Sequence, residues 1–196
     1  ESSPAIAPEF NLLFIGVQFG LFTKQGGIVA LDLRTGEKRW ESISPQPMTS
    51  SPAYYLKKKL VVIGSADRYV YLLRAGDGKL ISSFQLGGEI RGSCSFDEKR
   101  NLFLCGAFDG NFYAIDMNSG GNVIRFETMA PIHSTPLVLG DQVIVASLDK
   151  RIYCLDLNSG SLQWTFRADR RIFASPVMFD NRIYIGANDG RLYEID

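Results

Sequence analysis

The chain has 196 residues, of which 45% are hydrophobic and 21% are charged, as in an ordinary globular protein with a sizeable core. Lys and Arg together number 21, as do Asp and Glu, so the formal net charge is zero. Binding through nucleic-acid phosphates needs clustered positive charge, and we therefore expect no nucleic-acid partner. No apolar run is long enough for a membrane span, so none is predicted.

Several short sequence features recur in the same order along the chain. An acidic residue, replaced once by Arg, recurs at intervals of 42, 42, 40 and 40 residues, at Asp32, Arg74, Asp116, Asp156 and Asp196. The first four are each followed four residues later by a glycine, at Gly36, Gly78, Gly120 and Gly160. Glycine ends a tight turn without steric cost. A period near 40 residues indicates a repeat architecture.

Each repeat contains four short segments typical of β-strands. In the fourth repeat they are residues 134–139, 142–146, 151–156 and 161–166. They are rich in β-branched and aromatic side chains and are separated by turns that contain Gly, Asp or Asn, which predicts consecutive antiparallel hairpins. No window has helical spacing long enough to compete. Four strands in about 40 residues predict the blade of a β-propeller.

The repeats divide the whole chain into the blades of a single propeller segment. In chain order, the blades are predicted over about residues 1–47, 48–89, 90–131, 132–171 and 172–196. We expect an all-β propeller with four complete, four-stranded antiparallel blades and a partial fifth that stops after its third strand. Because the chain begins two residues before an inner strand, we expect a piece of a larger ring, completed by further blades or by another chain.

The first blade is longer than the others, with 48 residues from Ser3 to Ser51. The extra residues fall around positions 17–26, between the second and third strands, and they include Phe19, Leu21 and Phe22. Two interpretations are open: a longer hairpin that packs on the neighbouring blade, or a contact for a partner, since loops carry insertions and function.

Near the other end of the chain, the charge run Arg167–Arg171 contains an acid and predicts a solvated loop.

The three cysteines are Cys94, Cys105 and Cys154, an odd number without the CxxC spacing of a metal site. Cys94 and Cys105 flank a hairpin turn, so a pair across two strands is one alternative. Buried reduced thiols are the expectation, because free Cys behaves as a small hydrophobe. The cysteines leave the cellular compartment open.

The repeated aspartates are predicted to shape turns and not to perform chemistry. One set stands at Asp32, Asp116 and Asp156, and the other at Asp67, Asp109, Asp149 and Asp189. A catalytic residue is usually singular, whereas these recur in blade after blade, where a carboxylate accepts hydrogen bonds from its own backbone. We therefore predict no catalytic residue and no metal ligand.

One position varies while the sequence around it repeats. Two residues before each Ser/Thr-Pro signature, or its equivalent, the residue is Thr49, Arg91, His133 or Phe173. In a propeller this place rings one mouth of the channel, where variation can determine specificity. We predict these four residues as candidate ligand- or partner-binding residues, with Arg91 and His133 recognising an anionic or polar group. The alternative is an ordinary solvated or packed residue at the end of a strand.

Three phrases carry a resemblance to a known repeat family: Ala30–Trp40 (ALDLRTGEKRW), Ser175-Pro176-Val177 and Tyr184–Tyr193 (YIGANDGRLY). They resemble the pyrroloquinoline-quinone-like β-propeller repeat over nearly the whole chain. The resemblance departs at the family's tryptophan, four residues after the turn glycine, where Ser82 and Ile124 replace it. Those two blades are expected to use Phe84 and Phe126 instead to pack against the neighbour.

The resemblance implies several functions. Some members of the family are quinone-dependent alcohol or sugar dehydrogenases with calcium, whereas others are cofactor-free scaffolds, including a lipoprotein of the bacterial outer-membrane β-barrel assembly machine. The adjacent cysteines of the family's alcohol dehydrogenases are missing here. We expect a non-catalytic binding or scaffolding module with a protein or peptide partner and no cofactor.

Two alternatives to this module stay open. One is a fragment of a quinone-dependent dehydrogenase with pyrroloquinoline quinone and calcium. The other is an accessory or sensor domain of a kinase or an adenylate-forming enzyme. The resemblance implies an extracytoplasmic location for the scaffold and a cytoplasmic one for the adenylate-forming enzyme.

Overall fold

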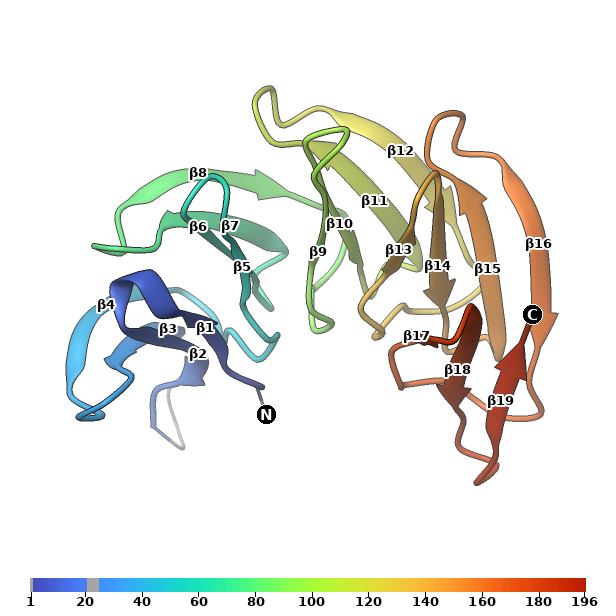
Figure 1. Ribbon diagram of the computed structural model, residues 1–196, viewed down its shortest axis with the longest axis horizontal. Helices are drawn as coiled ribbons and strands as arrows, with labels where there is room; N and C mark the ends of the chain where they lie inside the picture. Colours follow the sequence, from blue (N-terminus) through green and yellow to red (C-terminus); the bar gives the residue numbers. More distant parts are fainter. Residues whose placement is uncertain (1, 21–24) are drawn as a thin grey trace. The chain divides into compact units, whose positions relative to one another are not determined.

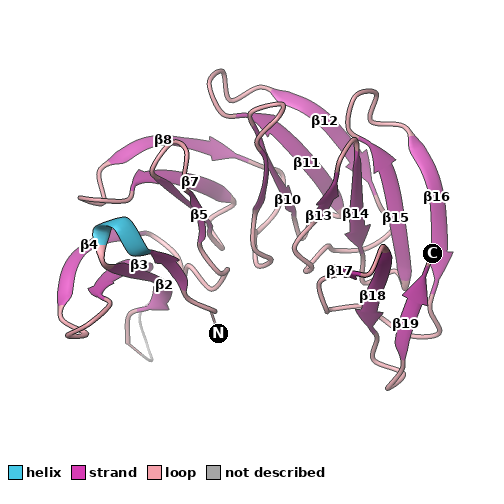
Figure 2. Ribbon diagram, viewed as in Figure 1, coloured by secondary structure: helices cyan, strands magenta, loops and turns pink. Residues whose placement is uncertain are grey.

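The computed structural model describes residues 2–20 and 25–196, which fold into two compact units. The first unit is Glu1–Cys94 and the second is Ser95–Asp196. Strands and connecting loops make up almost all of the described chain (Figure 2). A single 3-10 turn, η1 (Pro8–Phe10), follows the first strand. The all-β class predicted from the repeats is confirmed.

The first unit contains two antiparallel sheets, each of four strands in sequence order. The strands of the first sheet are β1 (Ala5–Ala7), β2 (Leu12–Gln18), β3 (Gly26–Asp32) and β4 (Lys38–Ser44). Those of the second are β5 (Ala53–Tyr55), β6 (Leu60–Gly64), β7 (Tyr69–Arg74) and β8 (Leu80–Gln85). The two short first strands, β1 and β5, contact each other, which places them on the inner side of the unit.

The second unit contains two four-stranded sheets and one of three strands, also in sequence order (Figure 1). The third sheet has β9 (Ser95–Asp97), β10 (Leu102–Gly106), β11 (Asn111–Asp116) and β12 (Asn122–Glu127). The fourth has β13 (Leu137–Leu139), β14 (Gln142–Ala146), β15 (Arg151–Asp156) and β16 (Leu162–Arg167). The fifth has β17 (Val177–Phe179), β18 (Arg182–Gly186) and β19 (Leu192–Ile195). Four complete blades and a partial fifth are therefore confirmed.

The turn between the third and fourth strands has the predicted chemistry. Oδ1 of Asp156 accepts hydrogen bonds from the backbone N–H groups of Asn158 and Ser159 at 2.9 and 2.7 Å. Gly160, at φ +73°, then donates its N–H to the Asp156 carbonyl at 2.8 Å. Asp32 and Asp116 make equivalent bonds. These carboxylates are therefore engaged by their own turns.

The turn between the second and third strands adds a hydrogen bond that the sequence did not suggest. Oδ1 of Asp149 accepts from the N–H of Arg151 at 2.8 Å, while Oδ2 accepts from the hydroxyl of Tyr153 at 2.6 Å. Burial of the hydroxyl, together with this bond, raises the pKa of Tyr153 to about 12. The same Asp–Tyr bond recurs at Asp67–Tyr71, Asp109–Tyr113 and Asp189–Tyr193. It ties the turn to the middle of the third strand in every blade that has it.

Successive sheets pack through apolar side chains that lie between them. Trp40 covers Gly78 in the next sheet and donates its Nε1–H to the Ala75 carbonyl at 3.0 Å. At the equivalent place in the second unit, Ile124 lies against Gly160. Ile124 itself therefore occupies the place of the tryptophan. The expectation that Phe126 packs against the neighbouring blade is confirmed by its contact with Tyr153, and that for Phe84 stays a prediction.

Phe126 has a separate role in packing. Its ring meets Tyr153 of the next sheet edge-on at 5.4 Å, as Phe166 meets Tyr193 at 5.3 Å. Because Phe166 belongs to a strand that also has its own tryptophan, Trp164, the phenylalanine position is a second contact and not a substitute for the first.

Two other expectations concern the cysteines and the long first blade. Cys94, Cys105 and Cys154 are all buried, and none forms a disulfide, which confirms the buried thiols.

In the first blade, β2 and β3 continue their pairing as far as Gln18 and Gly26, so part of the insertion lengthens the hairpin. Leu21 and Phe22 lie outside the described residues, and the partner-contact alternative stays a prediction.

In the second, third and fourth sheets, the last residue of the second strand lies against the linker that enters the next sheet. A Cβ atom on Gly106 would stand 2.0 Å from Cγ2 of Ile132, and one on Gly64 would stand 2.2 Å from Cγ2 of Ile90. In the fourth sheet the corresponding residue is Ala146, which shares a buried cluster with Ile172. A methyl group is thus tolerated only where the neighbouring linker is placed to receive it.

We predict that Gly106→Ala lowers the free energy of unfolding by about 1–3 kcal/mol, the usual cost of an extra methyl in a packed contact. Gly186→Ala is the matched control, because no heavy atom lies within 4 Å of its Cβ position. Denaturant unfolding of both variants measures the difference. Equal losses in the two variants would show that the close approach to Ile132 does not limit the packing.

The turn carboxylates predict a loss of stability in acid. Hydrogen bonds, led by those from the backbone N–H of Thr35, Ser119 and Ser159, hold the pKa values of Asp32, Asp116 and Asp156 below their usual range. A lowered folded-state pKa gives stability that is present above the unfolded-state value of about 4 and is lost as the pH falls through the folded-state pKa. The double variant Asp116→Asn, Asp156→Asn should therefore show a shallower dependence of the unfolding midpoint on pH between about 5 and 2. An unchanged slope would contradict this assignment.

Candidate partner-binding surface

The four candidate residues lie where the chain passes from one sheet to the first strand of the next. Buried serines fix two of these places. Ser134 Oγ donates to the Ala146 carbonyl at 2.8 Å and accepts from the Ala146 N–H at 3.2 Å, which anchors the residue after His133. Ser50 Oγ bonds to Gly64 in the same way and anchors the residue after Thr49. The position is therefore set by the fold and independent of which side chain occupies it.

Thr49 and Arg91 belong to the first unit. Thr49 is half-buried, and Arg91 is exposed. Arg91 Nη2 lies 2.8 Å from Oε2 of Glu89 in the same linker. An anionic ligand at Arg91 would therefore compete with a carboxylate that is already there, and the predicted role of this residue stays a prediction.

His133 and Phe173 belong to the second unit, and the structure brings them together. The imidazole of His133 is half-buried, with its centroid 5.7 Å from the Phe173 ring and 6.2 Å from the Phe108 ring, both edge-on. Phe173 remains 40% exposed. The three rings form a continuous row, which we call the aromatic row (Phe108, His133, Phe173).

Sequence reasoning missed Phe108. It lies in the turn between β10 and β11, where the equivalent residues of the other blades are Ala66, Leu148 and Asn188. It is therefore a variable residue inside a repeated frame, the same signal that identified His133. Phe108 differs from His133 and Phe173 in lying in a turn within a sheet and not in a linker between sheets.

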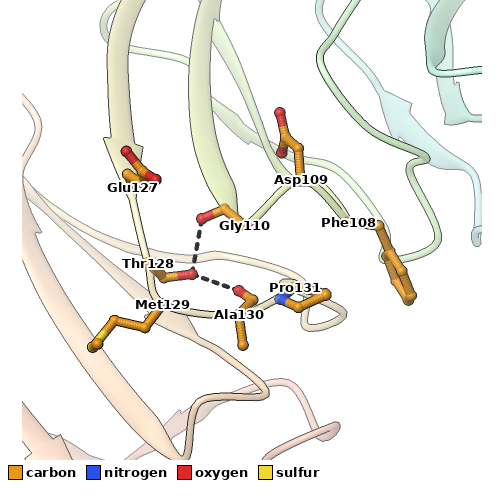
Figure 3. Close-up of a pocket in the computed structure, with 8 residues that line it drawn as sticks. All are labelled: Phe108, Asp109, Gly110, Glu127, Thr128, Met129, Ala130 and Pro131. Atoms are coloured by element: carbon orange, nitrogen blue, oxygen red, sulfur yellow. Dashed lines mark hydrogen bonds between the residues drawn. The ribbon is translucent and has the colours of Figure 1, made fainter.

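A cavity of about 640 Å³ adjoins the aromatic row at Phe108. Figure 3 shows its lining, with Phe108 at one end and Met129 at the other. Between them the Thr128 hydroxyl is within hydrogen-bonding distance of the Gly110 and Ala130 carbonyls, at 2.8 and 2.7 Å, which fixes the wall.

Met129 extends the apolar surface beside this cavity. Its side chain is 79% exposed, the largest exposed fraction among the big apolar residues that the structure describes. The backbone N–H of Met129 donates to Oδ2 of Asp149 at 3.0 Å, and the guanidinium of Arg151 lies 3.0 Å from its sulfur. These contacts hold an apolar side chain in solvent, an arrangement typical of a binding surface.

The groups that could perform chemistry near this surface can be taken in turn. In the described part of the chain, His133 makes no hydrogen bond to a carboxylate or a hydroxyl, so no nucleophile is activated beside it. Residues 2–20 and 25–196 contain no group of three or more His, Cys, Asp or Glu placed to hold a metal ion. The turn aspartates already accept hydrogen bonds, and these residues do not fit a calcium and quinone site. No helix among them is long and apolar enough to cross a membrane.

Three comparisons relate the chain to known proteins. A curated relative, "Outer membrane protein assembly factor BamB" of Shewanella oneidensis, is 27% identical over 151 residues, covering 70% of this chain and 36% of the relative. The crystal structure of BamB from Moraxella catarrhalis superposes with a TM-score of 0.82 at 20% identity, covering all of this chain and 57% of that one. The computationally designed Ika8 protein superposes with a TM-score of 0.77 at 16% identity, covering 99% and 70% of the two chains. These likenesses show the propeller fold, and the chain spans about a third of the length of the curated relative.

A family model carries the assignment further than these individual relatives do. The model described as "Outer membrane protein assembly factor BamB" matches residues 24–104 and 66–196, which together cover most of the sequence. Its matches include all the complete repeats from the second onward and the partial fifth. The chain therefore belongs to the BamB family of pyrroloquinoline-quinone-like β-propeller repeat proteins.

Proposed function

We propose that the chain is a non-catalytic scaffold module that binds a polypeptide partner through the loop surface of its second unit. The observation that carries this proposal is the aromatic row with Met129 beside it. Rigid aromatic rings supply contact area at a low cost in conformational entropy, and a flexible methionine adapts its shape to a partner. The surface stands on loops whose backbone is fixed by buried Ser134 and by Thr128.

The names of the relatives suggest where such a partner acts. The curated relative is an outer membrane protein assembly factor, and we propose that this chain serves the same process in an extracytoplasmic compartment. A scaffold in such a process holds other proteins in place and needs no cofactor. The residues of the surface, which recognise and do not react, agree with that role.

We also propose that the five blades form one propeller segment within a larger ring, with blade limits near residues 47, 89, 131 and 171. Exposed apolar side chains of the fifth sheet support this proposal. Leu192 is 72% exposed, whereas Ile152, the equivalent residue of the fourth sheet, is fully buried. Phe179 and Val177 of the same sheet are 73% and 57% exposed. A further blade or another chain would cover them.

Photo-crosslinking tests the binding surface in the full-length protein in its native cell. A photoreactive phenylalanine in place of Met129 is expected to give a discrete adduct with a protein of outer membrane assembly, identified by mass spectrometry. The matched control is the same substitution at Val123 of β12, an apolar residue that is 55% exposed and lies outside the surface. No adduct at 129, or the same adduct at 123, would overturn the proposed function.

Alanine variants measure the contribution of the surface to affinity. Met129→Ala together with Phe173→Ala should weaken binding of the crosslinked partner by about tenfold or more, since two exposed anchors are lost. Val123→Ala with Leu162→Ala, two exposed residues of the outer strands, should leave the affinity within about twofold. Thermal unfolding of both pairs checks that the fold is intact.

A further inference from the structure

A second cavity, of about 390 Å³, lies in the second unit at the equivalent place one blade further along. Its lining residues are Lys150, Arg170, Arg171 and Asn188. Backbone hydrogen bonds bring them together from three segments. The Ala168 N–H donates to the Lys150 carbonyl at 2.8 Å, and the Asn188 N–H donates to the Arg171 carbonyl at 3.0 Å.

The linker that carries the two arginines is anchored on both sides. Ala168 is 3% exposed and Ile172 is fully buried, so Arg170 and Arg171 project from a short segment between two fixed points. Both arginines are themselves exposed. The cavity is thus built by the frame of the blade, while its lining is free to contact a ligand.

The cations of this cavity have no carboxylate partner in direct contact. Among the residues that the structure describes, no carboxylate forms an ion pair with Lys150, Arg170 or Arg171. The three nearest acids in the sequence have other partners: Asp169 pairs with Arg191, Asp149 accepts from the Tyr153 hydroxyl, and Asp189 accepts from the Tyr193 hydroxyl. The cations are therefore left to attract an anion from outside the chain.

The equivalent segments of the preceding blade carry the opposite charge. Residues 147–151 and 167–171 include five basic and two acidic residues, whereas residues 107–111 and 127–131 include two acidic residues and no basic one. Because the backbone of the two blades repeats, the difference does not follow from the demands of the fold. The difference gives this part of the surface a local positive potential, although the formal net charge of the chain is zero.

The left-handed backbone at Lys150 aims its side chain from the turn between β14 and β15. Lys150 has φ +76°, and the equivalent residues are Arg68 at φ +74°, Gly110 at +84° and Gly190 at +80°. The turn therefore accepts a long basic residue as well as glycine, and here that residue lines the cavity.

These groups match carboxylates on a polypeptide. An arginine guanidinium binds a carboxylate through two parallel hydrogen bonds, a lysine adds a point charge, and the Asn188 amide can bond to a peptide group. Phe173 of the aromatic row follows Arg171 by two residues in the same linker. A ligand that uses both places must carry acidic and apolar side chains, which a free inorganic anion does not.

We propose that the cavity lined by Lys150, Arg170, Arg171 and Asn188 binds an acidic segment of a polypeptide, which continues onto the aromatic row through an apolar side chain. The proposal rests on the proposed function, because it names the chemistry of the partner at the same surface. It adds a second place of contact, with a defined charge, to the apolar anchors.

Fluorescence anisotropy with purified protein tests the proposal. The probe is a short labelled peptide of Asp, Glu and Phe residues, and the matched probe has Asn and Gln in place of the acids. The acidic probe should bind at least about tenfold more tightly than the neutral one, and its affinity should fall as salt is raised. Arg170→Ala with Arg171→Ala should remove most of that preference, whereas Arg170→Lys with Arg171→Lys should keep part of it.

The control variant is Arg34→Ala with Lys79→Ala, which removes two exposed positive charges from turns of the first unit. It should bind the acidic probe as the unaltered chain does. Equal binding of both probes, or an unchanged affinity in the Arg170 and Arg171 variant, would overturn the proposal. Competition by inorganic phosphate as strong as that by the unlabelled acidic peptide would also overturn it, because the site would then recognise anions without regard to peptide.

The two proposals fail separately. A crosslink at position 129 with no preference for the acidic probe would leave the partner-binding surface in place and remove the acidic segment as its ligand. Thermal unfolding of the arginine variants checks that a loss of peptide binding is not caused by a loss of fold. We expect the fold to be kept, because both arginines are exposed and the buried residues of the linker, Ala168 and Ile172, are unchanged.

Discussion

Everything at the loop surface depends on one contact, between a large apolar residue of each linker and the end of a second strand. Ile90 and Ile132 lie against glycines that have no room for a methyl group, and Ile172 packs in the cluster of Ala146. All three are fully buried. Because each directly precedes Arg91, His133 or Phe173, burial of the isoleucine determines where the variable side chain emerges. The contact supplies stability and also fixes the position of each variable side chain.

This contact separates the residues that build the blades from those that distinguish them. The Asp–Tyr bonds, turn glycines and interlocking rings recur because each blade solves the same packing problem. Side chains that no repeated contact requires, such as Phe108, Met129 and Lys150, are free to differ from blade to blade. A surface assembled from such residues can change its chemistry without a penalty in the core, which is how one propeller scaffold serves unrelated tasks.

The periodicity predicted the strands and turns well, since each rests on local rules: alternating apolar residues, and an aspartate followed by glycine. It predicted the site less completely. His133 and Phe173 were found because they vary within a frame. Phe108 joins them through its ring contact with His133, and Lys150 reaches the neighbouring linker through the hydrogen bond between its carbonyl and the Ala168 N–H, and neither contact is visible in the sequence. The run Arg167–Arg171 was interpreted as a solvated loop, and its arginines are exposed, yet the cavity it forms needs Lys150 and Asn188 from two other turns. Replacement of tryptophan by Ile124 likewise depended on which residue faces Gly160.

The surface of the second unit also has a direction. Phe108 lines the cavity that includes Asp109 and Glu127, it contacts His133, and His133 contacts Phe173, two residues from Arg171. Acidic, aromatic and basic groups therefore follow one another across two linkers. For the segment proposed to bind here, charges of opposite sign at the two ends would favour one orientation over its reverse, because reversal would place like charges together. The aromatic row would supply affinity, and the charged ends would supply orientation.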